Sequence, residues 1–154
     1  MNRISINTIY FPLPPWSCLL TAFAKKVLEE IGKDKWDLSV LLCSDETIKK
    51  FNSQYRGKNQ PTDVLAFSME EGEQFPSGKG KSFLMPGDII ISLDTLSKNA
   101  RRSKISEDEE LRRLLIHGIL HLNGMDHIVN DSMIQLQEQI LAKLNNEKIL
   151  ESNI

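Results

Sequence analysis

The sequence has no long apolar run and lacks the marks of several common classes of protein. Nowhere in its 154 residues do apolar residues reach the roughly 18 in succession that a membrane span needs. The N-terminus has no basic region followed by an apolar stretch and a cleavage site. We therefore expect no membrane partner and a cytoplasmic location.

Cysteine and net charge are also low. The two cysteines, Cys18 and Cys43, form no CxxC pair, which is consistent with reduced thiols in a reducing compartment. The formal net charge of -2 argues against a protein that coats nucleic acid by bulk electrostatics, because such binders usually have a pI above about 9. A nucleic-acid substrate would then be held by a few cations near a site, or delivered by a larger partner.

Histidine is scarce as well, and its placement is the most informative feature of the sequence. The chain has three histidines, His117, His121 and His127, all within one short segment. On a helix, side chains at i and i+4 lie on the same face, so the first two can present their imidazoles to one metal ion. Gly124 can reverse the chain in a left-handed conformation and swing His127 back toward them. We predict a metal site with these three ligands, in preference to three hydrogen-bonded core histidines.

Three neutral imidazoles with one open position are typical of catalytic zinc, whereas a structural site closes its fourth position with a protein ligand. We therefore expect one Zn²⁺ per chain, with water as the fourth ligand. Zinc lowers the pKa of bound water to about 7 and so makes hydroxide available near neutral pH. The same ligands also suit nickel, copper or iron, so the pattern leaves the metal open.

The residue after His117 is Gly118, and this absence of an acid matters. Zinc peptidases of the HExxH kind have a glutamate there as the general base, so a peptidase would have to find its base elsewhere. The surrounding helix is apolar over most of its circumference, and we expect it to be a buried central element whose polar sector opens on a cleft. Ser106 and Glu109 form a capping box at its start.

Hydrophobic periodicity outlines the rest of the fold. Branched apolar runs and alternation predict strands, intervals of three and four predict helices, and residues 70–81 predict a glycine-rich, charged loop between two strands. The pattern predicts one α/β (α+β) domain over residues 1–154, with a small mixed four-stranded sheet packed with about five helices. The expected strands are 3–10, 36–43, 64–67 and 88–92, and the expected helices are 16–31, 45–55, 93–104, the histidine helix and a last helix that begins at Asp131 or Ser132.

A second informative segment is NSQYRGKNQPTDVLAF, residues 52–67. Arg56 ends a helix just before Gly57, and Pro61 resets the chain for a strand. From the residues alone, an arginine in this place is most simply explained by a favourable interaction with the helix C-terminal dipole. Asp63 reads first as a turn residue at the strand entry.

Together with HGILHLNGMDH and PGDIIIS, this segment resembles the YbeY family of bacterial endoribonucleases, the rRNA maturation factors. The order and spacing of the three segments fit over most of the chain. The resemblance implies a single-strand-specific, metal-dependent endoribonuclease acting in 3′-end maturation of small-subunit (16S) ribosomal RNA and in ribosome quality control. It implies ribosomal RNA and the small ribosomal subunit as partners, with a ribosomal protein or GTPase that presents the substrate.

The resemblance also implies roles for individual residues. His117, His121 and His127 would be the zinc ligands, and Arg56 would be catalytic, stabilising the negative charge of a phosphodiester under attack. Attack by metal-bound water and attack by the RNA 2′-hydroxyl both stay open. Two other functions also stay open: a zinc metallopeptidase-like hydrolase, and a non-catalytic, zinc-stabilised ribosome-assembly factor. The chain departs from the family pattern at Ala66, where serine is usual.

Overall fold

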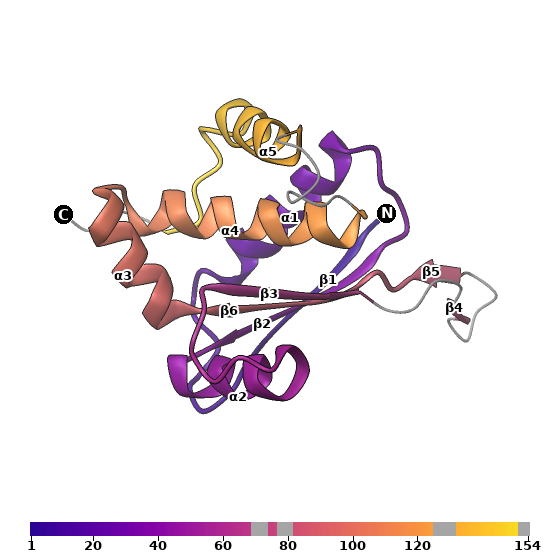
Figure 1. Cartoon of the computed structure of the whole chain (residues 1–154). Helices are drawn as coiled ribbons and strands as arrows, with labels where there is room; N and C mark the ends of the chain where they lie inside the picture. The colour runs from indigo at the N-terminus through magenta and orange to yellow at the C-terminus, as the bar shows by residue number, and fades with distance from the viewer. Residues whose placement is uncertain (69–73, 77–81, 125–131, 151–154) are drawn as a thin grey trace.

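A four-stranded mixed sheet lies at the centre of the fold (Figure 1). The computed structural model describes residues 1–68, 74–76, 82–124 and 132–150. Three strands run parallel and the fourth is antiparallel, in the order β1-β2-β6-β3, so the predicted mixed four-stranded sheet is confirmed. The strands are β1 (Arg3–Thr8), β2 (Asp37–Cys43), β3 (Val64–Ser68) and β6 (Gly87–Ser92).

Two departures from the predicted strands have local causes. β1 ends at Thr8 and not at residue 10, because Tyr10 has a positive φ of 69° and the chain turns there. The expected loop over residues 70–81 is wrong at β4 (Gln74–Pro76), which pairs antiparallel with β5 (Ser82–Leu84). A strand of three residues is too short to show alternation, so only its pairing partner reveals it.

The described residues form five helices, in agreement with the periodicity. Helices α1 and α4 cover one face and α2 covers the other, while α5 packs on the outer side of α4 (Figure 1). No helix in the described parts of the chain is long and apolar enough to span a bilayer. The helices are α1 (Ser17–Glu30), α2 (Asp45–Arg56), α3 (Leu93–Ser103), α4 (Glu107–Leu122) and α5 (Ser132–Lys143).

Helix α4 is the buried central helix that its sequence predicts. Leu111, Leu115 and Ile119 are 0% exposed, and they join the core between the sheet, α1 and α5. Each such side chain contributes about 1.5–3 kcal/mol through removal of apolar surface from water. The helix begins as predicted, because the Ser106 hydroxyl accepts a hydrogen bond of 3.0 Å from the Glu109 N–H. Core packing thus determines the position of α4, and the Ser106 cap determines its first residue.

At Gly118, α4 approaches the sheet so closely that a side chain there would press against Ile89. A Cβ there would lie 3.0 Å from both Cδ1 and Cγ2 of Ile89, which is itself 0% exposed on β6. This contact accounts for the glycine after the first histidine. A glutamate at this position, as in a zinc peptidase, would require Ile89 to shift.

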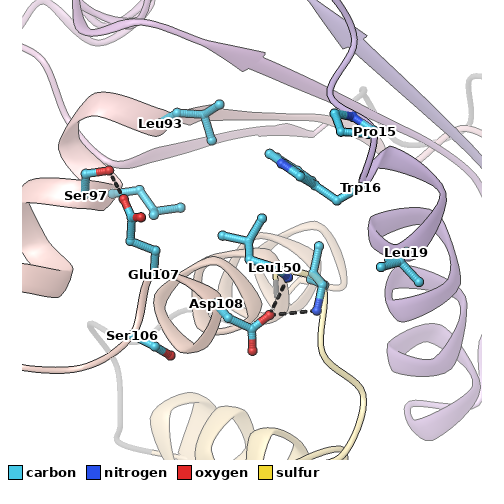
Figure 2. Close-up of a pocket in the computed structure, with 11 residues that line it drawn as sticks. Pro15, Trp16, Leu19, Leu93, Ser97, Ser106, Glu107, Asp108 and Leu150 are labelled. Carbon is cyan, nitrogen blue, oxygen red and sulfur yellow. Dashed lines mark hydrogen bonds between the residues drawn. The ribbon is translucent and has the colours of Figure 1, made fainter. Parts of the chain in front are cut away.

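Polar contacts hold the segment after α5 against α4. The Asp108 carboxylate accepts hydrogen bonds from the backbone N–H groups of Ile149 and Leu150, at 2.7 and 2.8 Å (Figure 2). The same carboxylate binds Arg112 Nε at 2.9 Å, and both side chains are 5% exposed. Leaving one charge of such a buried pair alone costs about 3–5 kcal/mol. The segment after α5 is therefore tied to the first turn of α4.

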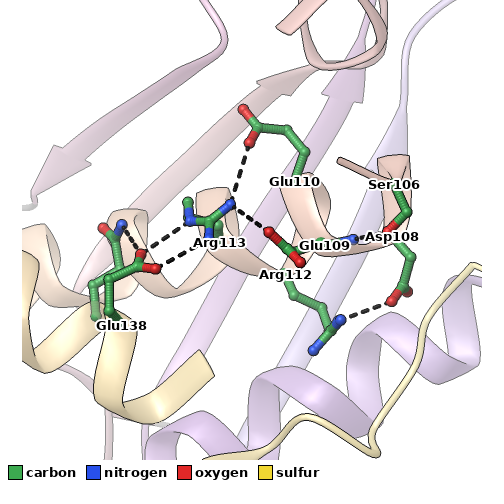
Figure 3. A network of polar contacts seen from close by, with 8 residues as sticks. Ser106, Asp108, Glu109, Glu110, Arg112, Arg113 and Glu138 are labelled. Atoms are coloured by element: carbon green, nitrogen blue, oxygen red, sulfur yellow. Dashed lines mark hydrogen bonds and ion pairs between the residues drawn. The ribbon is translucent and has the colours of Figure 1, made fainter. Parts of the chain in front are cut away.

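A second ion pair joins α4 to α5 (Figure 3). Arg113 donates from Nε and Nη2 to the two carboxylate oxygens of Glu138, at 2.9 and 3.0 Å, in a bidentate arrangement. These hydrogen bonds lower the pKa of Glu138, against the opposing effect of partial burial. The same pairing raises the pKa of Arg113. Glu138 is thus an ionised carboxylate near neutral pH.

The close contact at Gly118 gives a test of packing. Gly118→Ala should lower the free energy of unfolding by about 1 kcal/mol, because overpacking costs about 1–3 kcal/mol and the gain in helix propensity returns about 1 kcal/mol. Ile89→Val removes Cδ1, so it should cost less in the Gly118→Ala background than in the wild type. Urea unfolding of the four proteins measures this coupling. Additive effects would contradict the contact.

The Arg113–Glu138 pair gives a test against pH. Because the pKa of Glu138 is lowered in the folded state, the pair stabilises the protein above the unfolded pKa of about 4.3, and this stability is lost as pH falls through the folded pKa. Glu138→Gln should cost less than about 1 kcal/mol near pH 7, since Glu138 is 46% exposed. The deficit should shrink as the pH falls below about 4.3 and through the lowered pKa of folded Glu138. Glu29→Gln, an exposed change on α1, is the matched control in urea unfolding, and an equal profile for both variants would contradict the pairing.

Candidate functional site

His117 and His121 lie one turn apart on the same face of α4, as their spacing predicted. Their Nε2 atoms are 3.1 Å apart, and their ring centroids are separated by 4.7 Å in an edge-on arrangement. The two imidazoles therefore direct the same type of nitrogen to one point. Buried apolar residues on the rest of α4 leave this polar sector as the part that faces a cleft.

A glutamine of α5 supports the first of these rings. Gln137 Oε1 lies 2.7 Å from His117 Nδ1, and the Gln137 side chain is almost wholly buried. His117 thus contacts α5 through one ring nitrogen and His121 through the other. Gln137 was not among the site residues predicted from the sequence. A polar residue on the apolar face of an amphipathic helix is the signal that could have indicated it.

Helix α4 ends in the reversal that the sequence predicted. Gly124 has a φ of 85° and its N–H donates to the carbonyl of His121 at 3.0 Å. A left-handed glycine at this point turns the chain away from the helix axis. His127 lies outside the residues that the structure describes, so its part in the site stays a prediction.

Arg56 lines the same cleft and comes from a different helix, α2. It is the last residue of α2, and Gly57 follows in a left-handed conformation with a φ of 70°. Arg56 Nη2 donates to the carbonyl of Ala66 on β3 at 2.9 Å, and its guanidinium lies 5.2 Å from the centre of the Phe67 ring. The side chain therefore bridges α2 and β3, which the simpler explanation by the helix dipole did not anticipate.

Hydrogen bonds of the Asn52 and Asp63 side chains hold the segment between α2 and β3. Asn52 is 3% exposed and donates to the carbonyl of Gln60 at 2.9 Å. Asp63 accepts from Asn99 at 3.1 Å and from the backbone N–H of Val64 at 2.8 Å. These bonds make the segment a fixed wall of the cleft. Asp63 is a turn residue, as expected, and it also lines the cleft.

The cleft brings three of the predicted site residues together. Its volume is about 630 Å³, and Arg56, His117 and His121 all line it. Two cationic side chains, Arg56 and Lys58, and one carboxylate, Asp63, face it in a chain whose net charge is -2. The predicted polar sector of α4 therefore opens on a cleft, as expected. The two cationic side chains outnumber the one carboxylate in the cleft, which favours a ligand with negatively charged groups.

A second cleft, of about 780 Å³, lies at the other end of α4 and is larger (Figure 2). Apolar side chains such as Trp16, Leu19 and Leu93 supply much of its lining. Its most buried acid, Asp108, is already bound to Arg112 and to the C-terminal backbone. The predicted site residues line the smaller cleft, so we take the smaller cleft as the candidate site.

The histidine pair fits a metal ion. Two Zn–N bonds of about 2.0–2.1 Å at a tetrahedral angle place their nitrogens about 3.4 Å apart. The observed separation of 3.1 Å between the Nε2 atoms is close to that value. Among the residues that the structure describes, no third histidine, cysteine or carboxylate completes the pair. A third ligand would have to come from the segment that contains His127.

Comparison with known proteins places the chain among described relatives. A family model described as "Endoribonuclease YbeY" matches residues 12–145. An endoribonuclease YbeY of Treponema denticola is 45% identical over 151 residues, which cover 94% of this chain and 96% of the relative. The Treponema pallidum protein of the same description is 42% identical over 146 residues, covering 93% and 90%.

A solved structure has the same fold. The solution structure of TM1509 from Thermotoga maritima superposes with a TM-score of 0.61 and 30% sequence identity, and the match covers 97% of each chain. The family match includes α2, β3, β6 and α4, the elements that carry or support the cleft. The chain therefore belongs to the YbeY family of endoribonucleases.

Proposed function

We propose that this protein is a single-strand-specific, zinc-dependent endoribonuclease that acts in 3′-end maturation of small-subunit ribosomal RNA and in ribosome quality control. The observation that carries the proposal is the common cleft lined by the histidine pair of α4 and by Arg56 of α2. The family supports cleavage of RNA. The residues of the cleft supply a means of doing it.

Zinc would be held by His117, His121 and His127. When bound, it would supply a Lewis acid and lower the pKa of a coordinated water. The chain's own contribution is to hold the rings in place. Gln137 supports His117 through Nδ1, and α4 keeps His121 one turn away with Nε2 at 3.1 Å from its neighbour.

Arg56 would bind the scissile phosphate. Its guanidinium is oriented by the hydrogen bond to the Ala66 carbonyl and by the Phe67 ring. A planar guanidinium oriented in advance stabilises charge that develops on phosphate oxygens, and no reorganisation is needed during the reaction. Because the contact to residue 66 is to the backbone, an alanine in place of the usual serine leaves it intact.

The cleft also bears on the class of substrate. Lys58 adds a second cation beside Arg56, but the chain as a whole is slightly acidic. Such a protein gains little affinity from bulk phosphate attraction. Its substrate would be ribosomal RNA on the small ribosomal subunit, presented by a ribosomal protein or GTPase. The peptidase alternative is disfavoured, because residue 118 is a glycine and the glutamate that serves as general base in such peptidases is absent there.

Metal removal tests the zinc proposal. Elemental analysis should find one zinc per chain, and chelation should abolish cleavage of a single-stranded ribosomal RNA precursor, with recovery when zinc is added. The circular dichroism spectrum should persist after chelation, because the core between α1, α4 and the sheet is apolar and independent of the ligands. Unfolding on chelation would favour the non-catalytic assembly factor. Undiminished cleavage by metal-free protein would contradict the proposal.

Substitution of Arg56 tests the phosphate contact. Arg56→Ala should lower kcat/KM for RNA cleavage about 10²–10³-fold, as loss of one preorganised charge-stabilising donor does elsewhere. Arg56→Lys should recover only part of this, since an ammonium lacks the planar fork. Arg102→Ala, an exposed change on α3 outside the cleft, is the control. Equal activity of the Arg56→Ala and Arg102→Ala proteins, with unchanged zinc content, would exclude a catalytic role for Arg56.

A further inference from the structure

Helix α5 has three glutamines, and one of them is unlike the others. Gln135 and Gln139 are exposed, whereas Gln137 is 5% exposed and lies on the face that packs against α4. Burial of an amide is unfavourable unless both of its ends are hydrogen-bonded. Both ends of Gln137 have partners, and the identity of those partners determines which way the amide points.

The first partner fixes the amide group. Gln137 Nε2 lies 3.1 Å from Glu138 Oε2. Glu138 is held as an ionised carboxylate by the bidentate contact with Arg113 (Figure 3), and a carboxylate can only accept hydrogen bonds. The atom of Gln137 next to it must therefore be the NH₂ group. The amide oxygen is then the atom directed at His117.

The second partner fixes the histidine ring. A carbonyl oxygen only accepts, so the His117 Nδ1 that lies 2.7 Å from Gln137 Oε1 must carry the hydrogen. In a neutral imidazole, a proton on Nδ1 leaves a lone pair on Nε2. That Nε2 is the atom 3.1 Å from Nε2 of His121, on the side of the cleft.

We propose that Gln137 is a positioning residue that holds His117 in the Nδ1–H tautomer, and that the Arg113–Glu138 ion pair sets the orientation of the Gln137 amide. A series of hydrogen bonds thus connects Arg113 to Glu138, Glu138 to Gln137, and Gln137 to His117. Its effect on metal binding rests on the proposed function, whereas the tautomer itself does not. Arg113, Gln137 and Glu138 were not among the site residues predicted from the sequence.

The proposal has a chemical consequence for the site. A metal ion needs the lone pair of Nε2, so a ring held with its proton on Nδ1 is ready to bind without a change of tautomer. Loss of such a supporting hydrogen bond typically lowers metal affinity about 10–100-fold. A glutamine that only filled space between α4 and α5 would affect stability and leave the tautomer unchanged.

The test uses the full chain and its three histidines, which give few imidazole signals. Long-range ¹H–¹⁵N correlation spectra of metal-free protein, recorded well above the ordinary imidazole pKa of about 6.5, report which ring nitrogen carries the hydrogen. A zinc titration against a competing chromophoric chelator gives the affinity. The variants are Gln137→Met, Gln137→Glu and Glu138→Gln, with Gln135→Met and Gln139→Met as matched controls of similar helix propensity on the same helix.

Wild-type protein and both controls should show His117 protonated on Nδ1. Gln137→Met should lose this preference and bind zinc about 10–100-fold more weakly. Gln137→Glu should keep the tautomer even if it lowers stability, because a carboxylate still accepts from Nδ1. Glu138→Gln should give a smaller loss than Gln137→Met, since its amide can present either end to Gln137.

The proposal is overturned if wild-type His117 carries its hydrogen on Nε2, or if Gln137→Met keeps the wild-type tautomer and affinity. It is also overturned if the control variants lose affinity as much as Gln137→Met does. Should Gln137→Met fail to fold, Gln137→Glu and Glu138→Gln decide the outcome by the same two measurements. If the tautomers behave as expected but no variant and no wild-type protein binds metal, the positioning role stands and the proposed zinc site fails.

Discussion

The close packing of α4 on the sheet is the constraint on which the rest of the structure depends. Gly118 meets Ile89 of β6 where a side chain would crowd the contact, and the leucines and isoleucines around it are removed from water. This contact fixes the rotation of α4 about its axis. A helix that is apolar over most of its circumference has only one sector left for polar groups, and the rotation directs that sector, with its two histidines, into the cleft.

Ionic and amide contacts then set the finer orientation of the site. The Arg113–Glu138 pair is partly exposed and contributes little stability by itself. Its value lies in geometry, because it fixes one end of an amide whose other end contacts His117. On the far wall, Arg56 takes its direction from a backbone carbonyl, which no substitution of the Ala66 side chain removes. Both walls of the cleft are thus built from side-chain contacts between different helices and strands.

The two clefts at the ends of α4 show why size alone does not identify a site. The larger one is lined largely by apolar side chains, and its buried acid anchors the C-terminal backbone. The smaller one gathers two imidazoles, a guanidinium and an ammonium group. Only the second combination offers groups that bind a metal ion and a phosphate together.

The sequence by itself determined the elements and the chemistry of α4, because helical periodicity and i, i+4 spacing are local properties. The buried helix, the capping of α4 by Ser106, the turn at Gly124 and the four-stranded sheet all follow from such local patterns. The family resemblance added a role for Arg56, which helix-end chemistry did not require.

Only the tertiary structure decided which residues of different helices and strands contact one another. Nothing local to α5 says that Gln137 contacts His117, or that a glycine after that histidine reflects the position of Ile89. β4 has three residues and is recognisable only through its pairing with β5. Such contacts depend on how separate segments are placed in space relative to one another, and hydrophobic periodicity carries no information about that placement.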